Sequence, residues 1–79
     1  MEDIAGFVNG NNMRRNVLDV LNSKGPMDAK RIAKTLRCIP VTMDKVISEM
    51  EDNKLIANAG GKYDLTSEGK AVINFIHSV

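Results

Sequence analysis

Residues 28–56 read DAKRIAKTLRCIPVTMDKVISEMEDNKLI, two short helical patterns on either side of a break that contains proline. In each half the apolar residues fall within an arc of about 100° on a helical wheel, the stripe that a helix buries. The two stripes are Ala29, Ile32, Ala33 and Leu36, then Met43, Val46, Ile47 and Met50. Asp28 and Thr42 are the candidate N-caps. The stretch therefore predicts helices at Ala29–Arg37 and Met43–Asn53, joined by the tight connection Cys38–Val41.

The segment before this pair predicts one further helix. Its narrow apolar stripe consists of Met13, Val17, Val20 and Leu21. Asn12 is a reasonable N-cap, and Gly25-Pro26 ends the pattern because glycine suits a left-handed residue and proline forbids continuation. The expected helix is Met13–Asn22.

After residue 54 the apolar period changes from near 3.6 to near 2, which is typical of strands. Gly60-Gly61 lies between two short extended runs and predicts a β-hairpin, because both glycines tolerate positive φ. The expected register pairs Ile56 with Leu65 and Asn58 with Tyr63.

Thr66 can cap a last helix whose apolar residues cover about 200° of the wheel. One small domain rarely needs so wide a stripe, so we expect this helix to pack on a second subunit. The predicted dimer contacts are Val72, Ile73, Phe75, Ile76 and Val79.

The composition, with 79 residues, 43% hydrophobic residues and a net charge of +1, is that of one small globular domain. Residues 1–11 have helical spacing too short to predict a helix alone, so we interpret them as an N-terminal arm before a domain at 12–79. A domain of this size buries only about 60% of its unfolded surface, which makes a homodimer plausible. No apolar run is long enough to span a membrane, and the first residues lack the features of a secretion signal, so we expect a cytoplasmic protein.

Catalytic and metal chemistry lack the residues they need. Cys38 is the single cysteine and His77 the single histidine, and they lie far apart in the sequence. One chain cannot assemble a zinc cage from them, and Gly60-Gly61 lacks the surrounding motif of a phosphate loop. We expect no enzymatic activity, no cofactor, no metal and no small-molecule ligand.

The predicted order is three helices, two strands and a helix, a mainly α fold with a small β-hairpin that matches a winged helix-turn-helix. In this order the sequence resembles the small archaeal winged-helix transcriptional regulators, related distantly to the MarR and ArsR families. The resemblance covers residues 12–76 and is most specific at Tyr63-Asp64-Leu65-Thr66-Ser67-Glu68-Gly69-Lys70, which is similar to their return strand and final helix. It implies that the third helix enters the major groove of DNA, that the second crosses the phosphate backbone, and that the hairpin touches flanking phosphate.

The charge distribution is consistent with such a partner. Residues 1–40 carry seven cations and four anions, whereas residues 41–79 carry four cations and six anions. Lys30, Lys34 and Arg37 form one ridge beside the apolar stripe of the second helix, where each neutralised phosphate releases counterions. Arg15 and, in the hairpin, Lys62 are further candidates for phosphate contact. Base reading would fall to solvent-facing residues near the start of the third helix, namely Thr42, Asp44, Lys45 and Ser48.

Two features depart from the family. The expected hairpin loop offers one cation, Lys62, and Lys54 stands where the family usually has glycine, so that Asn53 or Lys54 must adopt the left-handed conformation. The leading hypothesis is a dimeric DNA-binding transcriptional regulator. The alternative is a winged-helix module for protein–protein interaction in a transcription or other macromolecular assembly, because the second half is acidic and the last helix is widely apolar.

Overall fold

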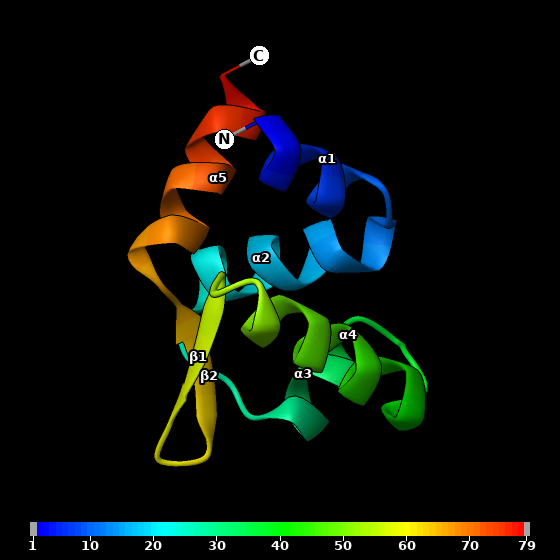
Figure 1. Cartoon of the computed structure of the whole chain (residues 1–79). Helices are drawn as coiled ribbons and strands as arrows, with labels where there is room; N and C mark the ends of the chain where they lie inside the picture. Colours follow the sequence, from blue (N-terminus) through cyan, green and yellow to red (C-terminus); the bar gives the residue numbers. More distant parts are fainter. Residues whose placement is uncertain (1, 79) are drawn as a thin grey trace.

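The computed structural model describes residues 2–78 and is mainly helical, with one pair of antiparallel strands, as the sequence predicts. The elements are α1 (Glu2–Asn9), α2 (Asn12–Lys24), α3 (Ala29–Thr35), α4 (Pro40–Asp52), β1 (Ile56–Ala59), β2 (Lys62–Leu65) and α5 (Ser67–His77). Figure 1 shows α1 and the end of α5 at one end of the molecule, and α3, α4 and the hairpin at the other. Helix α2 lies between the two ends.

The order differs from the prediction by one element, because residues 2–9 of the expected arm form the helix α1. Ala5 and Val8 are buried, and Ile4 and Phe7 pack against the core from its edge. A helix of eight residues is unstable alone, but α1 lies against α2 and α5, and this burial stabilises it. The same contact covers part of the wide apolar face of α5.

Two of the four predicted N-caps are correct and two are wrong. Asp28 accepts a hydrogen bond from the backbone N–H of Arg31 (2.7 Å), and Thr66 accepts one from Gly69 (3.0 Å), as predicted. The cap of α2 is Asn11 rather than Asn12. The prediction for Thr42 is wrong, because α4 begins earlier, with Pro40 in its first turn and Ile39 as the cap residue. Proline favours this start because its φ is already helical and its missing N–H would be unpaired there anyway.

Two consecutive helices end in the same way, each with a cation in the left-handed conformation. Helix α3 ends at Thr35, so the predicted end at Arg37 is wrong; Arg37 has φ 54°. Helix α4 ends at Asp52, and Lys54 has φ 62°, one of the two residues expected for this role. In both turns the N–H of the following residue donates to the carbonyl oxygen five residues earlier, Cys38 to Ala33 and Leu55 to Met50. These are Schellman motifs, in which glycine is the usual left-handed residue.

The hairpin has the predicted register, with Ile56 opposite Leu65 and Asn58 opposite Tyr63. Both turn glycines, Gly60 and Gly61, have positive φ. The sequence pattern missed a third backbone segment beside β2. Met27 donates to the carbonyl oxygen of Tyr63 (3.0 Å) and Tyr63 donates to that of Met27 (2.7 Å), so the loop before α3 is attached to the hairpin.

The joint between the two ends lies where α4, β1 and α5 meet. Gly69 in the first turns of α5 is buried, and a Cβ there would overlap the carbonyl oxygen of Leu55. The Thr66 hydroxyl donates to the carbonyl oxygen of Lys54 (2.6 Å), and the Thr66 N–H donates to that of Leu55 (3.1 Å). No helix in residues 2–78 is long and apolar enough to cross a membrane.

Candidate nucleic-acid interface

The solvent-facing side of α3 carries three cations. Ile32 and Ala33 are buried, which turns Lys30, Arg31 and Lys34 to solvent together with the uncharged Thr35. Among residues 2–78, none of the three cations forms an ion pair. Two members of the predicted ridge, Lys30 and Lys34, therefore share one exposed surface on α3.

Arg37, the third member of the ridge, lies outside the helix. Because α3 ends at Thr35 and Arg37 is left-handed, its side chain leaves the backbone in a direction that the wheel of α3 does not describe. It is exposed and lies in the turn that leads into α4. The ridge is thus a pair on α3 and a separate cation at the α3–α4 turn.

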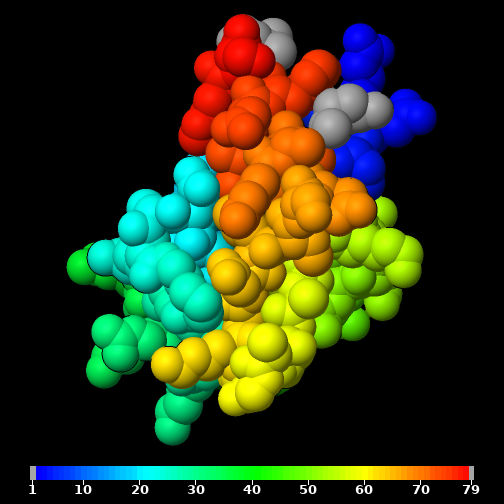
Figure 2. Space-filling model, turned by 90° about the vertical axis from the view of Figure 1, so that its left-hand side faces the viewer, coloured from blue at the N-terminus to red at the C-terminus, as the bar shows by residue number. Residues whose placement is uncertain are grey.

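A small hollow brings together cations from three elements. It measures about 170 Å³ and is lined by Lys24 at the end of α2, Pro26, Met27, Arg31 on α3 and Lys62 on β2. In Figure 2 the cyan end of α2, the teal start of α3 and the yellow and gold hairpin adjoin on the viewer's side. The backbone pairing of Met27 with Tyr63 places Lys62 here. The sequence identified Lys62 but missed Lys24 and Arg31, because the hollow exists only once the loop before α3 joins the hairpin.

The predicted base-reading residues lie on different sides of α4. At about 100° per residue, Lys45 and Ser48 lie opposite the buried stripe, together with Val41. Thr42 lies on the flank of Glu49, which pairs with Arg14 of α2 (3.1 Å). Asp44 falls on the other flank, beside Glu51.

The hairpin borders that second flank of α4, because Glu51 lines a hollow with Ala57 and Asn58 of β1. Of the predicted base-reading set, Lys45 and Ser48 therefore share the central exposed line, whereas Thr42 and Asp44 lie apart on opposite sides.

Arg15 is separated from the α3 cations. Its Nε lies 3.9 Å from Asp19 Oδ2, and it lines a hollow with Phe75 and Ile76 of α5. The structure therefore places Arg15 beside α1 and α5.

Arg14 on α2 connects three helices. Its Nη1 donates to the carbonyl oxygen of Phe7 (2.7 Å), its Nη2 pairs with Glu49, and its guanidinium lies 4.0 Å from the centre of the Phe7 ring. The side chains of Arg14 and Glu49 are both partly shielded from water. Arg14 is therefore occupied by contacts within the chain.

The residues predicted for a dimer contact divide into buried and half-buried. Val72 and Ile73 are 1% and 3% exposed within a single chain, so they belong to its own core. Phe75 and Ile76 are half-buried, and Val79 lies outside the described residues. The apolar surface of α5 that is available to a second subunit is smaller than the sequence predicted, because α1, which was not predicted, covers part of it.

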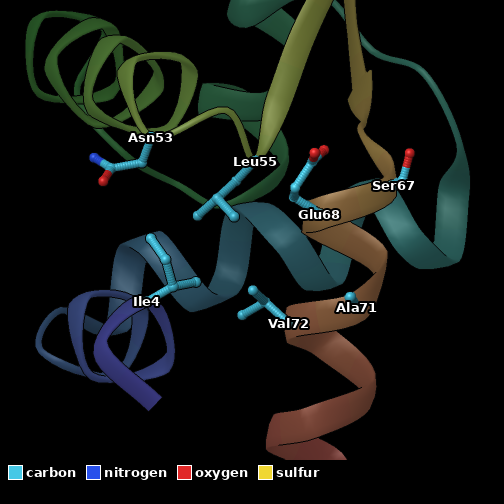
Figure 3. A pocket seen from close by; sticks show the side chains of 7 residues that line it. All are labelled: Ile4, Asn53, Leu55, Ser67, Glu68, Ala71 and Val72. Carbon is cyan, nitrogen blue, oxygen red and sulfur yellow. The ribbon is translucent and has the colours of Figure 1, made fainter. Parts of the chain in front are cut away.

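A second hollow, of about 330 Å³, lies between the start of α1, the end of α4 and α5. Figure 3 shows Ile4, Leu55 and Val72 extending toward one another in it, with Asn53 and Glu68 around them. It is mainly apolar and was not predicted, since it needs α1 as a wall. In the described part of the chain no three histidine, cysteine or acidic side chains gather as metal ligands, and Cys38 is a half-buried free thiol.

A family model described as the HVO_A0261 N-terminal domain matches residues 1–79. The chain belongs to this family. No curated protein and no solved structure matches it. The charge pattern of the domain is uneven, because three cations face solvent on α3, whereas α4 carries four acidic residues and one basic residue.

Proposed function

We propose that this HVO_A0261 N-terminal domain is a winged helix-turn-helix that binds duplex DNA and regulates transcription in the cytoplasm. The order of α2, α3, α4, the hairpin and α5 supports this fold, as does the pairing of Met27 with β2, which adds a third segment to the hairpin. The resemblance of residues 12–76 to small archaeal winged-helix regulators supports the function. In this arrangement α4 faces the major groove, and α3 and the hairpin lie along the phosphate backbone.

One observation carries the proposal: five cations from three elements lie around one end without an ion pair in residues 2–78. They are Lys24, Lys30, Arg31, Lys34 and Lys62. A protein that needed these residues only for solubility would gain from interspersed acids there, as on α4. Cations outnumber acids on this surface, where Asp28 is the acid at the start of α3. Such a surface attracts a polyanion, and each phosphate contact releases counterions.

Base reading is assigned to the central exposed line of α4. Lys45 can donate to a guanine edge, and the Ser48 hydroxyl can serve a base or a phosphate. Thr42 and Asp44 lie on opposite flanks and reach bases only near the edges of the contact. Because α4 is acidic toward its C-terminal end, its first turns enter the groove and its last turns stay outside it.

The direct test is fluorescence anisotropy with a labelled duplex across salt concentrations. We expect log K to fall linearly with log salt, by about 0.9 for each phosphate neutralised. The variant Lys30→Gln, Arg31→Gln, Lys34→Gln should lower this slope by about 2.7 without changing the melting temperature. The proposal loses its basis if the affinity for DNA is independent of salt concentration, or if the triple variant has the same salt slope as the wild type.

We also propose a homodimer through the far end of α5, with a smaller contact than the sequence predicted. Phe75 and Ile76 are half-buried at the edge of a hollow of about 480 Å³ that Ala5, Asn9 and Asn12 also line. Sedimentation at micromolar concentration should give a dimer for the wild type and a monomer for Phe75→Glu. A wild-type monomer would contradict the contact while leaving the DNA proposal intact.

The acidic face of α4 favours one second candidate, a protein-interaction module. Asp44, Glu51 and Asp52 are exposed and lack ion pairs within residues 2–78, and a basic partner surface would complement them. This reading gains support if no duplex binds at low salt and a protein partner instead protects α4 from hydrogen exchange. Binding of duplex DNA that survives Glu51→Gln, Asp52→Asn would count against it.

A further inference from the structure

The start of α4 exposes two large apolar side chains. Ile39 is 69% exposed and Val41 is 78% exposed, and they are the exposed large hydrophobic residues of the described chain. They lie on either side of Pro40, the first residue of the helix. Single exposed hydrophobic residues are common on protein surfaces, but here two lie at one helix end and the rest of residues 2–78 has none.

Neither side chain is part of the core. Both are absent from the core and from the partly buried side chains packed on it. The start of α4 has no side-chain cap, and Pro40 fixes the backbone without help from its neighbours. Because neither side chain is buried within the described chain, their apolar character points to a ligand.

The surroundings of the pair indicate the chemistry of that ligand. Val41 lies on the same exposed line of α4 as Lys45 and Ser48, one and two turns farther along the helix. Arg37 precedes Ile39 by two residues, is exposed, and forms no ion pair within the described chain. Asp44 is also exposed and lies one turn from Val41, so the pair adjoins one acidic side chain as well as the two cations. An apolar pair between Arg37 and Lys45 fits a partner that is anionic at its edges and carries apolar groups among polar ones at its centre. The major groove of DNA has phosphates on both sides, and the thymine 5-methyl groups are the apolar groups among its polar base edges.

We propose that Ile39 and Val41 contact thymine 5-methyl groups, so that thymines at fixed positions form part of the DNA site of this domain. This proposal rests on the proposed function and names what the leading end of α4 recognises. Lys45 and Ser48 then read the neighbouring base edges, and Arg37 holds the adjacent phosphate. Specificity comes in part from apolar contact, which suits a helix with few hydrogen-bond donors.

The test begins with a random-sequence duplex library from which the wild-type domain selects its preferred duplex. That duplex is synthesised again with deoxyuridine in place of thymine, one position at a time, which removes one methyl group and keeps the base pair. At the contacted positions we expect the affinity to fall by about fourfold for each methyl group lost. Positions outside the contact should show no change.

The variants assign the effect to the two side chains. Val41→Ser and Ile39→Ser should each bind the thymine and deoxyuridine duplexes equally well at one of the sensitive positions, with the salt dependence retained. Asn74→Ala, an exposed change on α5, should keep the wild-type ratio.

The outcomes separate this inference from the proposed function. A duplex bound with normal salt dependence but without sensitivity to deoxyuridine overturns the thymine contact and leaves DNA binding in place. If no duplex binds at any salt concentration, the proposed function fails as well. If the wild type self-associates and Val41→Ser does not, the apolar pair is a contact between two copies of the chain, and the proposed thymine contact is wrong.

Discussion

The two arginines at the start of α2 contact neighbouring acidic side chains, whereas the cations of α3 and the hairpin form no ion pair within residues 2–78. Arg14 contacts Glu49 and the carbonyl oxygen of Phe7, and Arg15 contacts Asp19. Lys30 and Lys34 have no ion pair in residues 2–78, and neither does Lys62. The difference separates positive charge that has acidic partners within the chain from positive charge available to a partner molecule. Formal net charge, which is +1 for the whole chain, hides this division.

Stability and DNA affinity should therefore respond to different substitutions, and Gly69 is the exception that affects both because it joins the two ends. In Gly69→Ala the new Cβ would overlap the backbone carbonyl oxygen of Leu55, which cannot move aside as a side chain can. We expect a loss of about 3 kcal/mol or more in the free energy of unfolding, measured by denaturant titration.

The matched control for this variant is Gly6→Ala. Gly6 is also in a helix, but a Cβ there meets nothing within 4 Å, so alanine should stabilise α1 by up to about 1 kcal/mol. If the two variants change the free energy of unfolding equally, the close contact between α5 and Leu55 is not what connects the two ends of the molecule.

Arg14 tests the fold-maintaining side of the comparison. Arg14→Met keeps an apolar stem over Phe7 but removes the hydrogen bond to its carbonyl oxygen and leaves Glu49 without a partner. We expect a loss of about 1–2 kcal/mol in unfolding free energy, discounted because both side chains are partly exposed. The control Arg15→Gln breaks an exposed pair and should cost under about 0.5 kcal/mol. If Arg14→Met lowers the salt slope of DNA binding and leaves the free energy of unfolding unchanged, Arg14 belongs with the DNA-binding cations and the proposed separation of the two groups of cations is wrong.

The hollow formed by Lys24, Arg31 and Lys62 tests the other side. Each single change to Gln should lower DNA affinity about fivefold near 0.15 M salt and reduce the salt slope by about 0.9, with an unchanged melting temperature. Arg15→Gln removes the same charge at the other end, so a nonspecific effect of net charge would appear there too. Equal losses in all four variants would mean that the position of the charge is unimportant.

The predictable part of this fold is local. Met43, Val46, Ile47 and Met50 are all buried as their spacing predicted, and Gly60-Gly61 set the hairpin register. Hydrophobic periodicity and turn preferences depend on residues that are close together in the chain, so they can be recognised in a single sequence. The element α1 was missed because its stability comes from contact with α2 and α5 rather than from its own eight residues.

The candidate site was less predictable than the fold because it depends on how the elements meet. The ridge of Lys30 and Lys34 follows from one helical wheel, and the structure leaves both exposed on α3. The position of Lys24 beside Lys62 depends on the pairing of Met27 with Tyr63, a single bridge without any period to read. The end of α3 was misjudged because Arg37 adopts a conformation that usually marks glycine.

That conformation supplies the smallest and most selective test. Arg37 and Lys54 both occupy the left-handed position of a Schellman motif, which costs a non-glycine residue about 1–2 kcal/mol, while glycine loses about 0.5–1 kcal/mol more entropy on folding. Arg37→Gly and Lys54→Gly should therefore each raise the unfolding free energy by about 0.5–1 kcal/mol. Only Arg37 lies at the turn that leads into the start of α4, which is proposed to face the DNA groove, so Arg37→Gly alone should also weaken DNA binding, by about fivefold. Equal stabilisation with unequal affinity would show that the cation at the α3–α4 turn is retained for binding at the expense of stability, whereas equal affinity would assign Arg37 to the fold alone.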